Sequence, residues 1–370
     1  MSRSNKKNLR KLTTAARSAG SKHSRQIHNN CPICFVVPPH ILREMAKNGN
    51  SDQQDWAFQS LTLSARIRGQ RDVAGLLPVL TPAGEKRRTV YDAQKGTDLP
   101  GKLVRGEGDE PTDDIAVTEA YDGAGATYDM YSEVFGRNSI DDKGMRLDSS
   151  VHYDVQYDNA FWDGSQMVYG DGDGEIFERF TKSIDVIGHE LTHGVTQYEA
   201  GLAYRNQSGA LNESMSDVFG SLVKQRVLNQ TAQEADWIIG EGLFTPSVNG
   251  VGLRSMKAPG TAYDDPVLGK DPQPAHMKDL YKGTKDNGGV HINSGIPNRA
   301  FYLAAVEIGG YAWEKAGKIW YTALRDRLRS RSQFKDAATI TIAVAGELYG
   351  KNSAEQKAVR NAWKTVGVIK

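Results

Sequence analysis

Apolar residues recur every three or four positions over two stretches in the middle of the chain, 184–199 and 210–226. This spacing predicts two amphipathic helices. After Gly295 the same spacing continues almost without a break, and Ser353 with Gln356 three residues later is the capping signature of a last helix. The second half of the chain is therefore expected to be mostly helical.

The first half of the chain has a mixed pattern. Helical spacing over 116–131 is followed by alternation of polar and apolar residues over 150–157, which predicts a strand. The glycine-rich run 170–174 predicts a turn, and it lacks the remaining positions of a calcium-binding EF-hand loop. A mixed α/β half followed by a helical half predicts an α+β protein with two lobes.

A separate segment precedes these two halves. Residues 40–46 have helical spacing, residues 57–70 suggest a second short element, and a loose Gly/Pro-rich region over 75–84 predicts a domain boundary. The expected division is a basic tail over 1–30, an N-terminal segment over 31–80, an α/β lobe over 81–203 and a helical lobe over 204–370.

Charge is distributed unevenly between these parts. Residues 1–80 carry thirteen basic and four acidic side chains, although the whole chain has a net charge of only +1. This imbalance predicts either an anionic partner such as nucleic acid or docking on the chain's own acidic body. The first residues are basic and Ser-rich without an apolar run, which predicts cytoplasmic residence or unconventional release, with secretion left open. No stretch is apolar enough to cross a membrane.

His189 and His193 carry the candidate chemistry. They lie four residues apart on a predicted helix, so both imidazoles occupy one face and can bind one ion. Glu190 lies beside the first histidine. This H-E-x-x-H arrangement is typical of zinc proteases, whereas the alternative interpretation is two surface histidines on a helix.

A third ligand is available on the next helix. Glu213 can complete a His₂Glu zinc site, and Asp217, one turn further, can accept the second ring N–H of a ligating histidine. His291 lies far downstream and follows Asp286, which could orient it. Taken by itself, His291 is more simply a loop histidine.

Three motifs together resemble the thermolysin family of zinc metalloproteases: Gly188-His-Glu-Leu-Thr-His-Gly-Val-Thr, Ser208-Gly-Ala-Leu-Asn-Glu-Ser-Met-Ser-Asp and Asp286-Asn-Gly-Gly-Val-His-Ile-Asn-Ser-Gly. The resemblance extends over about residues 85–370. It implies two lobes around a zinc cleft and the hydrolysis of internal peptide bonds. A zinc exopeptidase is the runner-up, but no motif that would read a free terminus is found.

The resemblance also implies how the metal is held and how water is activated. It makes His189, His193 and Glu213 the zinc ligands, with Asp217 and Asn212 as hydrogen-bond partners of the histidines. It makes Glu190 the general base, which takes a proton from the attacking water and later delivers it to the leaving amine.

Further residues are assigned to the substrate in the same way. His291 and Tyr204 resemble the donors that stabilise the oxyanion, and Asp286 orients His291. Asn159 and the backbone of Ala160 resemble the strand edge that aligns an extended peptide substrate by hydrogen bonds. Arg254 resembles the arginine that holds the substrate carbonyl on the leaving-amine side of the cleaved bond. Apolar residues match the pocket after the cleaved bond, which implies cleavage before Leu, Ile or Phe: Phe177, Phe180, Val186, Ile239, Leu243 and Leu253.

The front segment resembles a narrower branch, the protealysin-like precursors, through Pro38-Pro39-His-Ile-Leu. Residues 31–80 are therefore expected to form an inhibitory propeptide that acts through Pro38, Pro39 and His40. This favours self-docking of the basic segment over binding of nucleic acid. Cys31 and Cys34 are either a thiolate cap on zinc or, the interpretation we favour, reduced thiols that flank the docking segment.

Calcium binding is expected to be weak or absent. Lys224 and Ile238 stand where thermolysin-like proteins usually have acidic calcium ligands, and Val251 stands where an Asp is expected at another site. The ammonium of Lys224 could neutralise the carboxylates that remain there, Asp185, Asp236 and Glu241. The expected partners of a monomer are protein and peptide substrates, its own propeptide and a proteinaceous inhibitor.

Overall fold

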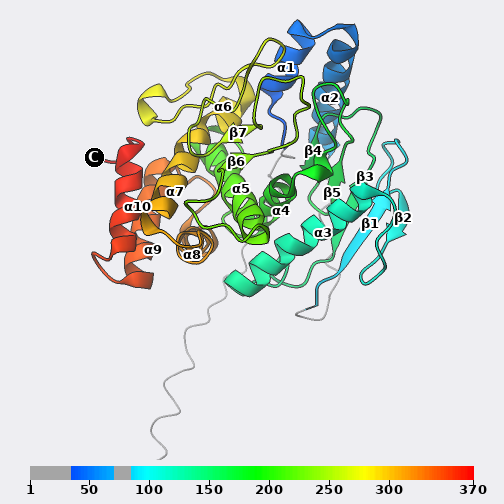
Figure 1. Ribbon diagram of the computed structural model, residues 1–370. Helices are drawn as coiled ribbons and strands as arrows, with labels where there is room; N and C mark the ends of the chain where they lie inside the picture. The colour runs from blue at the N-terminus through cyan, green and yellow to red at the C-terminus, as the bar shows by residue number, and fades with distance from the viewer. Residues whose placement is uncertain (1–34, 71–84) are drawn as a thin grey trace, which may run out of the picture.

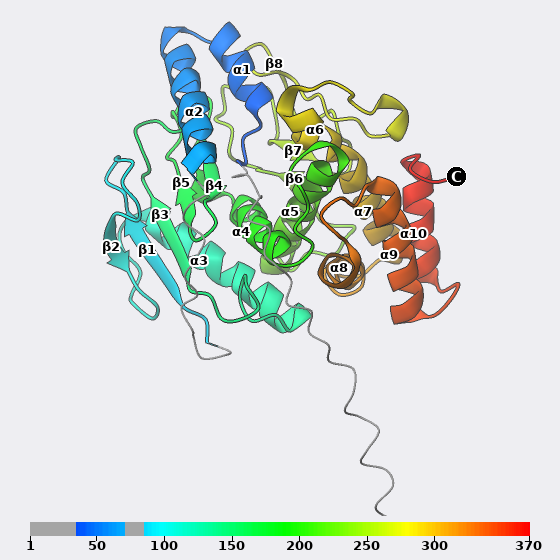
Figure 2. The ribbon, with the colours of Figure 1, turned by 180° about the vertical axis from the view of Figure 1, so that it is seen from behind.

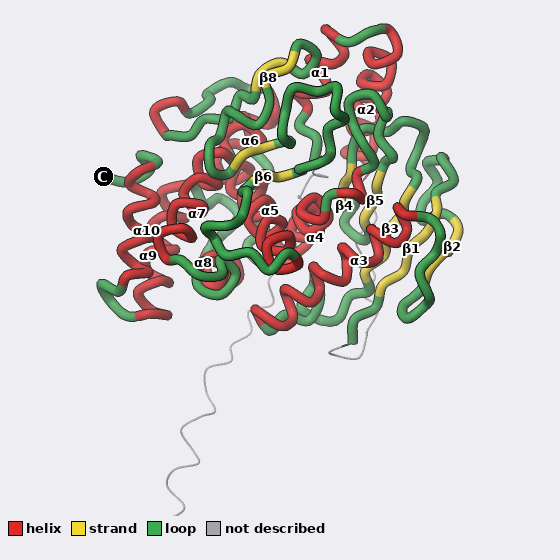
Figure 3. Tube along the Cα trace, viewed as in Figure 1, coloured by secondary structure: helices red, strands yellow, loops and turns green. Residues whose placement is uncertain are grey.

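The strands of the main sheet gather on one side of the molecule, and most helices lie on the other (Figure 3). The structure is a computed structural model that describes residues 35–70 and 85–370. Its main sheet has five strands in the order β2-β1-β3-β5-β4. Their bounds are β1 Arg88–Asp92, β2 Lys102–Arg105, β3 Leu147–Val151, β4 Ala160–Trp162 and β5 Met167–Tyr169.

The sheet is mixed, and its strand β4 is important for the site. β1 pairs parallel with β3 and β3 pairs parallel with β5, whereas β2 and β4 are antiparallel to their neighbours. β4 is the last strand of the sheet, and all its residues are buried. Its outer edge is covered by the N-terminal segment, because Phe35 forms an antiparallel bridge with Phe161.

The helices continue from the N-terminal segment to the end of the chain (Figure 1). They are α1 Pro39–Asn48, α2 Ser51–Gln70, α3 Ile115–Asp129, α4 Ile184–Tyr198, α5 Asn206–Val227, α6 Lys285–Asn293, α7 Gly295–Ile308, α8 Ala316–Thr322, α9 Phe334–Tyr349 and α10 Ala354–Thr365. Two short ribbons join them: β6 Ile238–Ile239 with β7 Arg254–Ser255, and β8 Asp264–Asp265 with β9 Gly269–Lys270. The predicted α+β fold with a mixed half and a helical half is confirmed.

Helices α4 and α5 pack closely at the centre of the molecule. Small residues permit this approach, because a Cβ at Gly220 would lie 2.3 Å from the carbonyl oxygen of Asp185, and a Cβ at Gly188 would lie 3.0 Å from Cα of Gly220. Both helices agree with the two amphipathic stretches in the sequence. Their close contact brings the histidines of α4 to the acidic face of α5.

Helices α1 and α2 form a hairpin that packs on the catalytic body (Figure 2). Pro39 opens α1, where its missing N–H costs nothing, and Gly49 follows its last residue. The α1 side chains of Ile41, Leu42 and Met45 are buried in the main core. The helix expected over 40–46 is confirmed, while the second element is longer than expected, because it begins at Ser51.

The strand expected over 150–157 is wrong. β3 ends at Val151, and His152, Asp154 and Gln156 then have φ angles of 54°, 57° and 53°. These left-handed residues alternate with the buried Tyr153, the exposed Val155 and the buried Tyr157, so the loop shows in its sequence the same two-residue period as a strand. The imidazole of His152 stabilises this loop by bridging two carboxylates that flank it.

Some predictions fall outside the described residues: the tail over 1–30, both cysteines, and the limit near residue 80. The division of the chain into four parts therefore stays a prediction. Ser353 caps α10 by accepting from the backbone N–H of Gln356, but the Gln356 side chain bonds to Asn352 and Ile342 instead of closing the box. In the described part of the chain, no helix is long and apolar enough to span a membrane.

Candidate metal centre and peptide-binding cleft

Two buried histidines on α4 have their ring orientation fixed by α5. Nδ1 of His189 lies 2.8 Å from Oδ1 of Asp217, and Nδ1 of His193 lies 2.8 Å from Oδ1 of Asn212. The amide nitrogen of Asn212 donates to the carbonyl of Leu202, which leaves its oxygen for the ring. Both Nδ1 atoms are therefore placed as donors, and in the neutral form of such a ring the Nε2 atom carries the lone pair that can bind a metal.

These lone pairs converge with a carboxylate. The Nε2 atoms of His189 and His193 are 3.0 Å apart, and the two oxygens of Glu213 lie 3.6 and 3.5 Å from them. Oε2 of Glu213 is buried and has no hydrogen-bond partner among the residues that the structure describes. Burial lowers the pKa of His193 to about 3, which keeps that ring neutral. Two lone pairs and an unpaired carboxylate oxygen fit a divalent cation with His₂Glu ligands.

A second carboxylate, that of Glu190, stands beside this cluster. Its ligand atom and those of His189 and His193 lie within 4.8 Å of one another. Oε2 accepts a hydrogen bond from the backbone N–H of Trp162, and within the described parts of the chain Oε1 has no partner. Burial and the negative charge of Glu213 raise the pKa of Glu190 well above its usual range, and a bound cation would act in the opposite direction. We take Glu213 as the ligand because it faces both Nε2 atoms, which leaves Glu190 available for proton transfer.

An ion pair connects the metal cluster to the cleft. Arg254, from β7, donates to both carboxylate oxygens of Asp217, and Asn298 donates to Oδ2 of Asp217 at 2.8 Å. Burial disfavours the charged carboxylate, but Arg254 and His189 outweigh it and hold the pKa of Asp217 well below its usual range. The side chain that orients a metal-binding histidine therefore also positions the arginine.

His291 and Tyr204 meet on the other side of the cluster. The hydroxyl of Tyr204 donates to Glu213, and its oxygen lies 3.0 Å from Nε2 of His291. Nδ1 of His291 is 2.6 Å from Oδ1 of Asp286. Burial opposes a charge on the ring, but Asp286 and Glu213 outweigh it and raise the pKa of His291 to about 9. The ring is therefore a charged donor near neutral pH.

A left-handed turn at the start of α6 presents Asp286 to this ring. Asp286, Asn287, Gly288 and Gly289 have φ angles of 55°, 51°, 86° and 78°. A side chain at Gly288 would collide with Asn206, because its Cβ would lie 2.1 Å from Oδ1. The Asp-Asn-Gly-Gly sequence suits this backbone, which few other residues adopt.

The cleft beside the cluster is filled by the chain's own residues 35–37. The N–H of Val36 donates to the carbonyl of Ala160 at 3.2 Å, and the N–H of Val37 donates to Oδ1 of Asn159 at 2.9 Å. The amide nitrogen of Asn159 donates a hydrogen bond of 3.4 Å to the carbonyl oxygen of Val37. This segment therefore adds to the edge of β4 as an extended peptide would.

Two carbonyls of the same segment point at charged donors. Nη1 of Arg254 lies 3.1 Å from the carbonyl oxygen of Val36, and Nε2 of His291 lies 3.2 Å from that of Phe35. Around one short stretch of backbone, the structure thus brings together the three groups expected to align a substrate, Asn159, Ala160 and Arg254, and the expected oxyanion donor His291.

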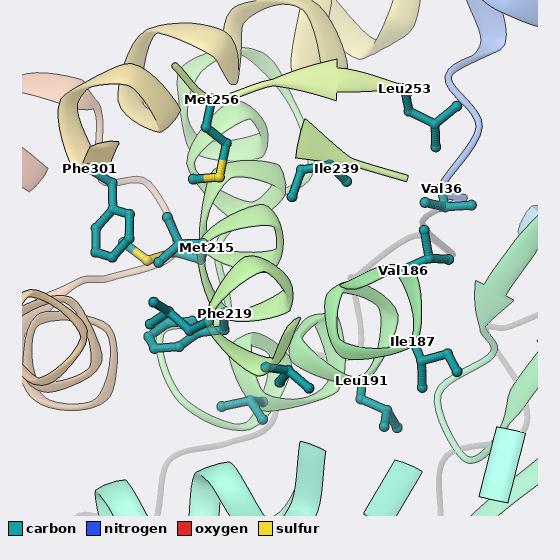
Figure 4. Close-up of a cluster of buried hydrophobic side chains, with 14 of the residues drawn as sticks. Val36, Val186, Ile187, Leu191, Met215, Phe219, Ile239, Leu253, Met256 and Phe301 are labelled. Atoms are coloured by element: carbon teal, nitrogen blue, oxygen red, sulfur yellow. The ribbon is translucent and has the colours of Figure 1, made fainter. Parts of the chain in front are cut away.

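The side chain of Val36 enters an apolar pocket. Figure 4 draws it between Val186 and Leu253, with Ile239 close by, and Val36 is fully buried. All six residues predicted to line the pocket are buried in the core cluster that contains Val36. The neighbouring Phe35 packs its ring on Phe161, with centroids 5.3 Å apart.

The proline motif lies just beyond this segment. Pro38 precedes α1 and Pro39 opens it, while Nε2 of His40 is 3.0 Å from the hydroxyl of Tyr263. The backbone contacts in the cleft come from Phe35, Val36 and Val37, which the sequence reasoning missed. The apolar run before two prolines was the only signal for them.

The carboxylates expected at a calcium site surround Lys224. Its ammonium lies 3.1 Å from Asp185, 3.0 Å from Asp236 and 3.7 Å from Glu241, and it donates to the carbonyl of Ile238 at 2.7 Å. Burial opposes the charge of Lys224, but Asp185 and Asp236 outweigh it and raise its pKa. The ammonium occupies the centre of this cluster.

Comparison with known proteins agrees with this geometry. Residues 82–197 match the family described as "Thermolysin metallopeptidase, catalytic domain", and residues 200–368 match "Thermolysin metallopeptidase, alpha-helical domain". The chain is 52% identical to "Extracellular metalloprotease" of Pectobacterium carotovorum subsp. carotovorum, over 91% of this chain and 97% of that protein. It is 50% identical to "Protease PrtS" of Photorhabdus sp. (strain Az29), over 93% and 94%.

A solved structure is similar along nearly the whole chain. The "Precursor of Protealysin, Metalloproteinase from Serratia proteamaculans" superposes with a TM-score of 0.84 at 54% identity, covering 91% of this chain and all of that one.

The relatives correct one expectation from the sequence. Cytoplasmic residence is contradicted, because relatives at about half identity include a protein named as an extracellular metalloprotease. That expectation rested on the missing apolar run near the start of the chain. Such a run belongs to one class of export signal, so its absence does not decide where a protein acts.

Proposed function

The chain belongs to the thermolysin metallopeptidases and is a zinc metalloendopeptidase, and on that premise we propose that it is a zymogen that cleaves before bulky apolar residues. The observation that supports this proposal is the segment 35–37, which contacts every predicted substrate-aligning group and places Val36 in the apolar pocket. A substrate would use the same contacts once this segment has left.

In the proposed reaction, His189, His193 and Glu213 would hold a zinc ion, which when bound would supply a Lewis acid for the scissile carbonyl and lower the pKa of water. Glu190 takes the proton of the attacking water on its free Oε1 and later gives it to the leaving amine.

The charge that develops on the carbonyl oxygen is met by two donors. His291 is held in its charged form by Asp286, and the hydroxyl of Tyr204 lies beside it. The charged ring of His291 is held by Asp286 before substrate arrives, so its stabilisation of the oxyanion requires little reorganisation. The hydroxyl of Tyr204 donates to Glu213 in this structure and would have to turn its proton toward the oxyanion. Removing one such donor typically costs about 100- to 1,000-fold in rate.

Specificity follows from the pocket that holds Val36. Its walls are apolar and buried, so a charged side chain after the cleaved bond would lose hydration without gaining a partner. Peptide libraries should show Leu, Ile, Phe or Val at this position. A preference for charged residues there would contradict the proposed pocket.

Latency follows from the docked hairpin. Residues 35–37 block the edge of β4, and α1 buries Ile41, Leu42 and Met45 against the catalytic body. The similar solved structure is itself described as a precursor of a metalloproteinase. Residues 31–80 would therefore act as an inhibitory propeptide until they are removed.

The decisive experiment compares Glu190→Gln with the parent on casein. The variant should keep one zinc ion per chain, measured by elemental analysis, and lose cleavage by at least about 1,000-fold. Glu347→Gln, which changes a carboxylate paired with Arg327 on the surface, serves as the matched control and should stay active. An active Glu190→Gln protein would exclude this residue as the general base.

A further inference from the structure

Residues 35–37 lie in the cleft in the register of a substrate. Val36 and Val37 donate their N–H groups to the edge of β4, and the carbonyl of Val36 accepts from Arg254. The chain therefore runs antiparallel to β4, as a strand added to that edge would. With Val36 in the pocket after the cleaved bond, the residue before that bond is Phe35.

The carbonyl of Phe35 has the position of a reacting carbonyl. It is 3.2 Å from Nε2 of His291, and that same nitrogen is 3.0 Å from the hydroxyl of Tyr204 and 3.6 Å from Glu213. A cavity of about 150 Å³ that has room for water is lined by Phe35, Tyr204 and His291 among others. The bond between Phe35 and Val36 thus lies where the proposed chemistry takes place.

We propose that the Phe35–Val36 bond is a self-cleavage site, cut by the chain's own zinc centre while residues 35–37 are docked. This inference rests on the function proposed above. Water adds its oxygen to the carbonyl carbon of Phe35, and the C–N bond to Val36 breaks. Glu190 carries one proton of the water to the nitrogen of Val36, and the second proton passes from the new carboxyl group of Phe35 to the same nitrogen. Phe35 thus ends in a carboxylate and Val36 in a charged amino terminus.

The cut releases residues 1–35 but does not clear the cleft. Val36 stays in its pocket, Val37 keeps its bonds to Asn159, and α1 remains buried through Ile41, Leu42 and Met45. The protein cut at this bond is therefore still latent. Activity would require a later cut nearer the catalytic body, or dissociation of the hairpin.

The test follows the amino terminus of the full-length chain. Protein stripped of zinc by a chelator receives one equivalent of zinc, and intact mass spectrometry with N-terminal sequencing follows the products. A species that begins at Val36 should form at a rate independent of protein concentration, as expected for a cut in place. Glu190→Gln should not form it.

Val36→Pro supplies the matched variant, because proline has no N–H for Ala160 and blocks this register. It should not be cut after residue 35, and after its N-terminal segment is removed by an added protease it should cleave casein as the parent does. That readout shows that the variant folds.

Two outcomes would overturn the inference. One is parent protein that cleaves casein but never yields a chain beginning at Val36, which leaves the endopeptidase proposal intact. The other is a cut whose rate rises in proportion to protein concentration, which would place it between molecules. Loss of casein cleavage in the fully processed parent would instead remove the proposed function itself.

Discussion

Arg254 donates to both carboxylate oxygens of Asp217, with Nη2 2.8 Å from Oδ1 and Nε 2.9 Å from Oδ2. The same Oδ1 lies 2.8 Å from Nδ1 of His189. One buried carboxylate therefore contacts both a histidine that we propose as a zinc ligand and an arginine that we propose to hold the peptide. The proposed metal site and the proposed peptide site are thus linked through a single side chain.

Asp217→Asn keeps the shape of this side chain and removes its charge. The N–H of His189 would then face a weaker acceptor, and Arg254 would lose its buried counter-charge. We expect zinc affinity to fall by about 10- to 100-fold, measured by competition with a chromophoric chelator. Asp326→Asn, which changes a surface partner of Arg325, should leave zinc affinity unchanged. Equal affinities in all three proteins would show that Asp217 does not support the metal site.

Lys224 should replace a structural cation. Removing its ammonium by Lys224→Met leaves the fully buried Asp185 without its counter-charge, which typically costs about 3–5 kcal/mol. Thermal melting in a Glu190→Gln background, where self-digestion is absent, measures this loss, and Lys318→Met on the surface is the control.

The effect of added calcium on the melting temperature is a second test of the role of Lys224. With the zinc site filled, added calcium should hardly shift the melting temperature of the parent. A large upward shift would mean that calcium binds beside the ammonium, and our interpretation of Lys224 would be wrong.

His152 makes stability depend on pH in the alkaline range. The hydrogen bond and charge of Asp171, joined by those of Asp114, outweigh burial and raise the pKa of His152 to about 9. A raised pKa means that the folded protein holds this proton more tightly than the unfolded chain. The contribution is complete below pH 6.5 and is lost as pH rises to about 9.

The side chain is partly exposed, so solvent screening limits the effect to about 0.5–1 kcal/mol. Chemical denaturation of Glu190→Gln with and without His152→Gln should give a difference in unfolding free energy at pH 6 that shrinks toward pH 9.5. A difference that grows with pH would have the opposite sign to this linkage.

The sequence predicted those parts of the fold and site that depend on short-range patterns. The histidines of α4 and the acids of α5 lie one turn apart within their helices, so helical periodicity and ligand spacing identified them together. The α1 helix was found for the same reason, because Pro39 and Gly49 mark its ends.

Features that depend on distant contacts were not predictable in this way. The docked position of residues 35–37 depends on hydrogen bonding and bridging to β4, more than a hundred residues away along the chain. A left-handed turn places the carboxylate of Asp286 against the ring of His291. Neither a helical nor a strand period in the sequence indicates such a turn. The loop after Val151 was mistaken for a strand because its left-handed residues repeat every two positions.

Val36→Asp should weaken latency. The side chain of Val36 is fully buried among apolar groups, so a carboxylate there would lose its hydration without a partner. A cost of about 3 kcal/mol would shift the docking equilibrium by roughly a hundredfold. Freshly zinc-loaded full-length variant should therefore cleave casein at once, whereas the parent shows a lag. Val227→Asp, at a valine that is 53% exposed, is the matched control and should keep the lag. If Val36→Asp shows the same lag as the parent, the pocket contact does not hold the enzyme inactive, and the α1–α2 hairpin must do so alone.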